Sequence, residues 1–248
     1  MSLPQVVSRE QWLVARKALL AKEKELTRTR DALNTRRREL PMVEVEKEYL
    51  FEGSDGKATL LDLFDGHRQL IVSHVMFDPS WDDACPSCTA GIEERSPGLV
   101  EHLSTRDTAL VHVSRAPIAK IEDYRRRKGW DITWVSSHGS DFNYDYAVTM
   151  DDSVTPVIYN YKTVDEHRDS GTEYYFSGQQ PSEQPGMSCF LRNGDAIFHT
   201  YSTYGRGAEQ TGGSYYYLDL TALGRQEKWE EPSGRADFSR EPVPDFHE

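Results

Sequence analysis

The feature that most constrains the fold of this chain is a pair of apolar runs, residues 70–77 and 109–113, separated by a helical pattern. Short continuous apolar runs predict strands that are buried on both faces, as in parallel sheets. The helix between them is expected to begin near Pro86 and to run past Ser96-Pro97-Gly98, and a second helix is expected over 118–127. The alternation of strands and helices predicts an α/β sheet with helices on its faces.

The longest predicted helix covers residues 8–40 and forms an N-terminal amphipathic arm over residues 1–41. Ser8 and Gln11 fit a capping box at its start. Apolar residues recur at seven-residue spacing, at Trp12, Leu19, Leu26, Leu33 and Leu40. The second seam of such a repeat, which includes Lys22 and Arg36, is mostly polar, whereas a coiled coil needs two apolar seams. The pattern therefore favours an arm that packs on its own domain or on a partner, and a homodimer through this helix is the alternative.

Residues 42–224 are predicted to form one α/β domain, and the polar residues 225–248 a tail without a fixed fold. Four further elements are expected in the second half of that domain: strands at 157–161 and 173–176, a hairpin over 187–201 that turns at Asn193-Gly194, and a helix at 214–223. The Asn-Gly pair is a strong hairpin signal.

Charge and hydropathy exclude several classes of partner. The 248-residue chain has a formal net charge of −12, although residues 8–40 carry ten basic and five acidic side chains. A nucleic-acid-binding domain needs a net basic surface, so no nucleic acid partner is expected. No apolar stretch reaches the roughly 18 residues of a membrane span, and the N-terminal residues show no secretory signal pattern. The sequence therefore predicts a cytoplasmic protein with no membrane partner.

The strongest chemical signal is Cys85-Pro86-Ser87-Cys88. A C-x-x-C beside a strand–helix–strand pattern in a cytoplasmic chain indicates a thioredoxin-like redox site. Free N–H groups and the positive end of the dipole at a helix N-terminus favour a thiolate, and Pro86 suits the first helical position. Cys85 is predicted to be the attacking thiolate and Cys88 the thiol that resolves the mixed disulfide.

Other chemistry is less well supported by the sequence. The carboxylates of Asp82 and Asp83 disfavour a neighbouring thiolate, so Cys85 is expected to be less acidic than in the strongest oxidants of this type. A zinc site needs four ligands, and the remaining cysteine and the histidines show no matching spacing. Neither a metal nor an organic cofactor is expected. Cys189, His74 and His112 are predicted to be core residues.

Four stretches of the chain resemble a known family: residues 11–27, 36–41, 49–56 and 198–207. They are similar to motifs of the bacterial thioredoxin-like family called domain of unknown function 899, which is related to the peroxiredoxin and thiol-reductase branches of the thioredoxin superfamily. The resemblance covers nearly the whole chain. It implies a thioredoxin-like three-layer α/β/α sandwich that carries the long N-terminal helical arm.

The same resemblance implies the position of a proline in the site. Members of the wider superfamily place a cis-proline opposite the C-x-x-C, nine positions before the hairpin glycine. Pro185 lies nine positions before Gly194, which implies a cis bond between Gln184 and Pro185, although Gly186 stands where threonine is usual. The predicted substrate groove comprises Trp81, Pro86, Pro185 and Gly186.

Three functions remain open from the sequence. The leading expectation is a thiol–disulfide oxidoreductase that acts on a protein or small-molecule disulfide or thiol. A thioredoxin-like binding protein without turnover is the second, because fold does not fix function. The third is a peroxidase, which is weaker because Asp82 occupies the position of the threonine in the peroxiredoxin motif that would run from Pro79 to Cys85.

Overall fold

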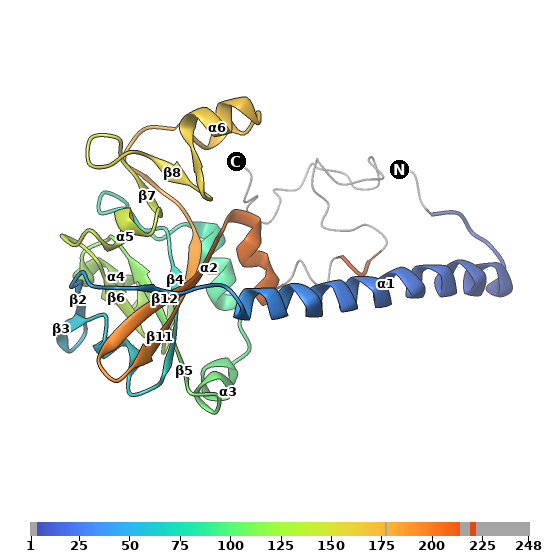
Figure 1. The fold of residues 1–248 in the computed structure, drawn as a ribbon, viewed down its shortest axis with the longest axis horizontal. Helices are drawn as coiled ribbons and strands as arrows, with labels where there is room; N and C mark the ends of the chain where they lie inside the picture. The colour runs from blue at the N-terminus through green and yellow to red at the C-terminus, as the bar shows by residue number, and fades with distance from the viewer. Residues whose placement is uncertain (1–3, 177, 214–218, 222–248) are drawn as a thin grey trace. The chain divides into compact units, whose positions relative to one another are not determined.

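The computed structural model describes residues 4–176, 178–213 and 219–221 (Figure 1). The chain divides into two compact units, and the sequence passes from the first to the second between Pro41 and Met42. The helix predicted over 214–223 lies outside the described residues except for residues 219–221. The predicted tail, 225–248, lies wholly outside them.

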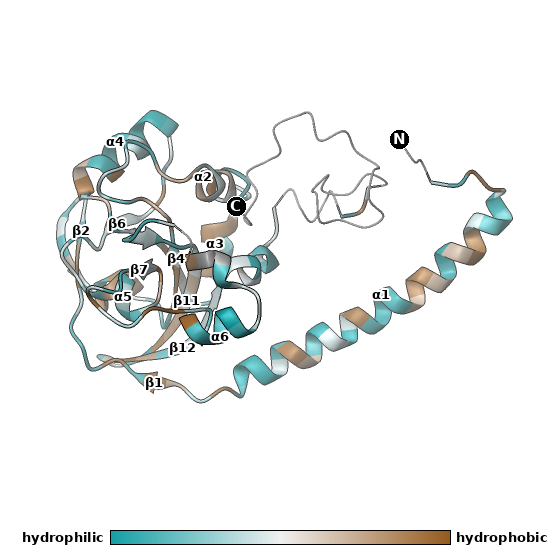
Figure 2. Cartoon of the chain, turned by 90° about the horizontal axis from the view of Figure 1, so that it is seen from above, coloured by the Kyte–Doolittle hydropathy of each residue, from teal (hydrophilic) through white to brown (hydrophobic). Residues whose placement is uncertain are grey.

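The first unit contains α1 (Arg9–Arg38). Its start has the predicted capping box: the Gln11 amide donates to Ser8 Oγ over 3.2 Å, and the Ser8 amide donates to Gln11 Oε1 over 3.1 Å. Figure 2 shows apolar residues recurring among polar ones along the whole helix. None of its side chains is buried. No helix in the described part of the chain is long and apolar enough to cross a membrane.

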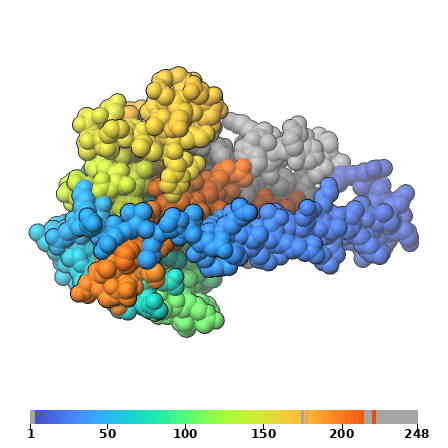
Figure 3. All heavy atoms as spheres, viewed as in Figure 1, coloured from blue at the N-terminus to red at the C-terminus, as the bar shows by residue number. Residues whose placement is uncertain are grey.

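The second unit is built on an eight-stranded sheet with the strand order β1-β12-β11-β4-β5-β6-β2-β3. The strands are β1 (Val43–Glu44), β2 (Leu50–Gly53), β3 (Gly56–Thr59), β4 (Gln69–His74), β5 (Thr108–Ser114), β6 (Trp134–Ser136), β11 (Gly186–Asn193) and β12 (Ala196–Tyr204). Strands β4, β5 and β6 run parallel, and the β11–β12 hairpin pairs antiparallel to the other edge of β4. A parallel strand–helix–strand unit joined to such a hairpin is the thioredoxin-like topology. In the space-filling view, the segment that holds β1 lies along β12, with which it pairs (Figure 3).

Helices cover both faces of this sheet. The parallel strands are connected by α2 (Pro86–Glu93) with α3 (Leu99–Ser104), and by α4 (Ile118–Lys128). Successive residues of β6 point to opposite faces. Trp134 packs with Ile92 of α2 and Ile121 of α4 in one core. Val135 belongs to the other core, to which η1 (Asp62–Phe64) and α5 (Phe142–Asp145) contribute Phe64 and Phe142. The result is a three-layer α/β/α sandwich.

The remaining elements lie mostly between β6 and β11: β7 (Thr149–Met150), β8 (Ile158–Tyr159), β9 (Lys162–Thr163), α6 (Val164–Asp169), η2 (Glu173–Phe176), β10 (Ser182–Glu183) and, after β12, η3 (Gly205–Thr211).

Two predicted elements are wrong. The helix that begins at Pro86 ends at Glu93, because the residue before Pro97 disfavours helical geometry, and α3 is a separate helix. Residues 173–176 form a 3-10 helix and not a strand. Aromatic residues favour strands only where neighbouring strands are present for them to pack on, so the residue types alone do not determine a strand.

Candidate functional site

The cysteine pair lies where β4 leads into α2. Cys85 is the N-cap residue of α2, Pro86 occupies the first turn, and Cys88 lies one turn further along. The Cys85 carbonyl accepts the first hydrogen bond of the helix, from the Thr89 amide over 3.0 Å. Both cysteines are free thiols and partly buried. The sulfur of Cys85 is therefore at the end of the helix where backbone N–H groups have no partner within the helix.

The backbone of Met76 contacts both cysteines. Its carbonyl accepts from the Cys85 amide over 2.9 Å. Its own amide donates to Cys88 Sγ over 3.4 Å. Met76 follows β4 by two residues, so the position of the pair is tied directly to the central strand of the sheet.

The two thiols have very different acidities. The pKa of Cys85 is lowered to about 6, first because the Cys88 thiol donates a hydrogen bond to it, and further because the amides of Cys88 and Ser87 point at it. Burial opposes this shift. The pKa of Cys88 is raised well above its ordinary value, because the hydrogen bond to Cys85 retains its proton and because it is buried. Near neutral pH the pair therefore holds one thiolate, at Cys85, and one thiol, at Cys88.

The acidic residues upstream of the pair have less influence than the sequence suggests. Asp82 and Asp83 are both exposed. Asp83 forms an ion pair with Arg127 of α4 over 2.5 Å, and the arginine offsets its charge. The hydrogen bonds to the Cys85 sulfur therefore decide its acidity.

A cationic side chain, that of Arg95, lines the same pocket as Cys88. Arg95 follows α2, and its Nη2 donates to Ser73 Oγ over 3.1 Å. Its Nη1 contacts Nε2 of His112, whose pKa burial lowers to about 3, so both partners of the guanidinium are uncharged at neutral pH. The positive charge of Arg95 favours the thiolate form of Cys88. Nothing in the local sequence around Arg95 indicates this contact.

A small pocket of about 120 Å³ lies against Cys88. Arg95, Pro185 and Gly186 contribute to its lining, so the predicted groove residues Pro185 and Gly186 do lie beside the cysteine pair. Trp81 and Pro86 are exposed and lie outside the described lining of this pocket.

The predicted cis bond before Pro185 is wrong: among the described residues, the cis peptide bond is Gln180–Pro181. The Gln184 amide donates to the Val148 carbonyl over 2.8 Å, and β11 begins only two residues later. The chain at Pro185 is therefore already directed towards β11, and Pro185 lines the pocket although the peptide bond before it is not cis.

Gly186 has a steric reason for departing from the usual threonine. A Cβ atom built at this position would lie 2.9 Å from Cδ1 of Tyr204 and 3.2 Å from Cγ1 of Val148. The tyrosine ring occupies the space that a larger side chain would need. The close approach explains why glycine stands beside the pair in this chain.

A largely buried ion-pair cluster connects the loop before Cys85, at Asp78, to the segment before Pro185, at Glu183, through Arg115. Arg115 Nε donates to Glu183 Oε1 over 2.7 Å, and its Nη2 contacts the Asp78 carboxylate. Thr149 Oγ1 donates to the other oxygen of Glu183 over 2.9 Å. Burial raises the pKa of Glu183. The cluster connects the loop before Cys85 to the segment before Pro185. A charged residue two positions after the buried run 109–113 is the one sequence signal that could have found Arg115.

Two of the three residues predicted to belong to the core, His74 and His112, are buried, whereas Cys189 is half-buried. His74 Nε2 hydrogen-bonds to Ser188 Oγ over 2.8 Å, Ser188 to Ser202 over 2.8 Å, and Ser202 to His199 Nε2 over 2.7 Å. This row crosses β4, β11 and β12. His74 is buried, which lowers its pKa to about 3. Cys189 lies on β11, where burial raises its pKa to about 11, so it is a poor nucleophile at neutral pH.

Comparison with known proteins gives one strong match and several weak ones. The family model described as "Bacterial protein of unknown function (DUF899)" matches residues 1–240. No curated protein matches the chain. Peroxiredoxin Q of Xanthomonas campestris is similar at 12% identity, over 65% of this chain and 85% of that chain, with a TM-score of 0.38. A putative protein disulfide isomerase of Bacteroides thetaiotaomicron is similar at 21% identity, over 42% and 65%, with a TM-score of 0.30. At these TM-scores the structural similarities carry no argument, and the fold assignment follows from the strand order.

Proposed function

The chain belongs to the DUF899 family of bacterial proteins, and from the geometry of its cysteine pair we propose that it is a thiol–disulfide oxidoreductase. The observation that carries the proposal is the placement of Cys85 at the N-cap of α2, with a pKa of about 6, next to a Cys88 that keeps its proton. Disulfide exchange begins with attack by a thiolate, and Cys85 is the cysteine of the pair that is ionised at neutral pH.

The reaction proceeds in two exchange steps. The Cys85 thiolate attacks one sulfur of a substrate disulfide, forms a mixed disulfide and releases the other substrate sulfur as a thiolate. Cys88 then transfers its proton to solvent and attacks Cys85 Sγ as a thiolate, which breaks the mixed disulfide, closes the Cys85–Cys88 disulfide and releases the second substrate sulfur as a thiolate. The substrate gains two electrons and the cysteine pair loses two. An external dithiol or thiol must return the pair to its reduced form.

The surroundings of the pair support a role for the predicted groove. Pro185 and Gly186 line the pocket at Cys88, while Trp81 and Pro86 are exposed. We expect a disulfide that approaches Cys85 to contact Trp81 and Pro86. In this proposal, the substrate is a disulfide of a protein or of a small molecule, and a reducing cytoplasm would keep the pair reduced between turnovers.

Insulin reduction with dithiothreitol as the electron donor tests the proposal, combined with the reduction potential of the Cys85–Cys88 pair measured by equilibration with glutathione. Wild type and Cys189→Ser are expected to reduce insulin at the same rate. Cys85→Ser is expected to be inactive, because a serine hydroxyl is not ionised near neutral pH. No insulin reduction by wild type would support the binding protein, and thiol-dependent loss of hydrogen peroxide would support the peroxidase.

A further inference from the structure

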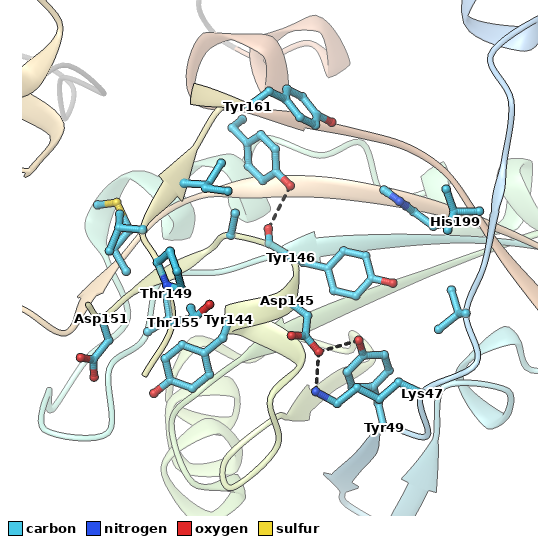
Figure 4. Close-up of a pocket in the computed structure, with 18 of the residues that line it drawn as sticks. Lys47, Tyr49, Tyr144, Asp145, Tyr146, Thr149, Asp151, Thr155, Tyr161 and His199 are labelled. Carbon is cyan, nitrogen blue, oxygen red and sulfur yellow. Dashed lines mark hydrogen bonds and ion pairs between the residues drawn. The ribbon is translucent and has the colours of Figure 1, made fainter. Parts of the chain in front are cut away.

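A second and larger cavity, of about 540 Å³, opens in the same unit (Figure 4), and neither Cys85 nor Cys88 is among its described lining residues. Its wall is formed by the chain around β1, the end of α5, the segment from β7 to β8, and β12. None of its described lining residues also lines the pocket at Cys88. The cavity is therefore a separate candidate site, and the proposed exchange reaction does not use it.

Tyrosine rings dominate the wall of this cavity. They belong to Tyr49, Tyr144, Tyr146, Tyr161 and Tyr204. Three of the hydroxyls already donate to the protein. That of Tyr49 donates to Asp145 Oδ2 over 2.7 Å, that of Tyr161 to the Ser202 carbonyl over 2.8 Å, and that of Tyr204 to the Tyr146 carbonyl over 2.9 Å. The Lys47 ammonium group already lies 5.5 Å from the centre of the Tyr49 ring, and Tyr146 and Tyr204 are buried. The rings best able to offer a face to a ligand are therefore those of Tyr144, which is half-buried, and Tyr161, which is exposed.

The ionised groups of the wall are predominantly acidic. The carboxylates are those of Glu44, Glu46, Asp145 and Asp151. The ammonium group of Lys47 is already held by Asp141 over 2.8 Å and Asp145 over 2.7 Å. Burial lowers the pKa of His199, which is therefore uncharged at neutral pH. Figure 4 shows Lys47 and Tyr49 converging on Asp145, so this one cation is directed at the protein and is not free to bind an anion.

From the aromatic wall and its acidic charge, we propose that this cavity binds a small organic cation, an ammonium group attached to an apolar body. Aromatic faces attract such cations, and the carboxylates of the wall add a favourable field. Asp145 is paired with Lys47, so an anion would face the carboxylates of Glu44, Glu46 and Asp151, and the described lining offers no other lysine or arginine to bind it. An uncharged polar ligand would find three of the five tyrosine hydroxyls already engaged.

Calorimetric titration of the full-length protein with three probes that share a benzene ring tests the charge preference: benzyltrimethylammonium, benzyl alcohol and benzenesulfonate. Benzyltrimethylammonium is expected to bind at least about tenfold more tightly than benzyl alcohol, because only the cation gains from the rings and the carboxylates. Benzenesulfonate is expected not to bind. Equal binding of benzyl alcohol and benzyltrimethylammonium, or no binding of benzyltrimethylammonium, would overturn the proposal.

Substitutions in the wall test the location. Tyr161 is 65% exposed, so its replacement is not expected to disturb the core. Tyr161→Ala should weaken binding of benzyltrimethylammonium about fivefold, whereas Tyr161→Phe, which keeps the ring, should stay within about twofold of wild type. The double variant Glu44→Gln/Glu46→Gln should weaken binding and reduce its salt dependence, and Glu52→Gln on β2, outside the lining, should not. If neither Tyr161→Ala nor the double variant changes the affinity, the cation binds elsewhere and the proposal fails. Cys85→Ser should bind as wild type does, which separates this site from the proposed redox site.

Discussion

The amide of Met76 donates a hydrogen bond to Cys88 Sγ over 3.4 Å, two residues after the end of β4. The same residue accepts the amide of Cys85, so one peptide segment sets the positions of both thiols. Because β4 is hydrogen-bonded on both sides, by β5 and β11, this segment has little freedom to move. The central strands thus fix the positions of both thiols, while the difference in their acidity comes from the hydrogen bond between them, because the Met76 amide itself lowers the pKa of Cys88.

The reactivity of Cys85 is expected to follow a pKa of about 6. The rate of its alkylation by iodoacetamide should be low below pH 5, rise through about pH 6 and level off by pH 7, because only the thiolate reacts. With limiting reagent at pH 7, mass spectrometry should find Cys85 labelled before Cys88 and before Cys189, whose pKa is raised to about 11. Preferential labelling of Cys189 would contradict the assignment of the attacking thiolate.

A Cys88→Ser variant should accumulate a mixed disulfide between Cys85 and its substrate. Serine cannot resolve the intermediate, so the covalent complex persists until an external thiol releases it. Purification of the tagged variant from a lysate of the native bacterium, followed by non-reducing electrophoresis, should show dithiothreitol-sensitive bands. The Cys85→Ser/Cys88→Ser double variant is the matched control and should show none. Identical bands in both variants would mean that Cys85 does not form them.

Much of the fold could be predicted because its signals are local. The capping box of Ser8 and Gln11, the apolar runs of β4 and β5 and the Asn193-Gly194 turn each act over a few residues. The placement of Cys85 at a helix start followed from Pro86 and from the strand before it.

The parts of the site that the sequence did not predict depend on contacts between distant segments. Arg115 meets Glu183 across 68 positions, and no spacing rule links the two. The side chain of Tyr204 is what requires glycine at position 186, and only the register of β11 and β12 brings these residues together. The cis bond expected at Pro185 failed for the same reason, because the offset to Gly194 carries no information about how residues 181–185 reach the sheet.

The protein should lose stability as the pH falls below about 6.5, because His74 and His112 are buried and uncharged. Their pKa is about 3 in the folded state, whereas an unfolded histidine takes up its proton near pH 6.5. Between these values the unfolded state binds more protons, so each histidine lowers the free energy of unfolding by about 1.4 kcal/mol per pH unit as the pH decreases.

Urea denaturation at pH 6 and pH 5 measures this slope. Most of the contribution of Cys85 is lost above that interval, as the pH falls from about 8.5 through about 6, and the remainder is the same in wild type and in the histidine variants. The variant His74→Gln, which retains a group that can hydrogen-bond to Ser188, should have a shallower pH dependence. His102→Gln, at an exposed position on α3, should leave the slope unchanged. Equal slopes in wild type and His74→Gln would show that His74 does not stay uncharged in the folded state.

The sequence leaves a homodimer through α1 as the alternative to an arm that packs on its own domain. Because none of the side chains of α1 is buried, we expect its apolar residues at seven-residue spacing to pair with those of a second chain. Four of these residues lie on α1, at Trp12, Leu19, Leu26 and Leu33, and each is between 45% and 60% exposed. A 30-residue helix with such a stripe gains stability chiefly by covering it. Light scattering coupled to gel filtration should therefore give the mass of a dimer for the full-length protein. Leu26→Glu/Leu33→Glu should give a monomer, because carboxylates cannot be buried in the pairing seam. Thr29→Glu, on the polar second seam of the same helix, is the matched control and should remain dimeric. A monomeric wild type at tens of micromolar, or a double variant that stays dimeric, would show that this stripe does not join two chains.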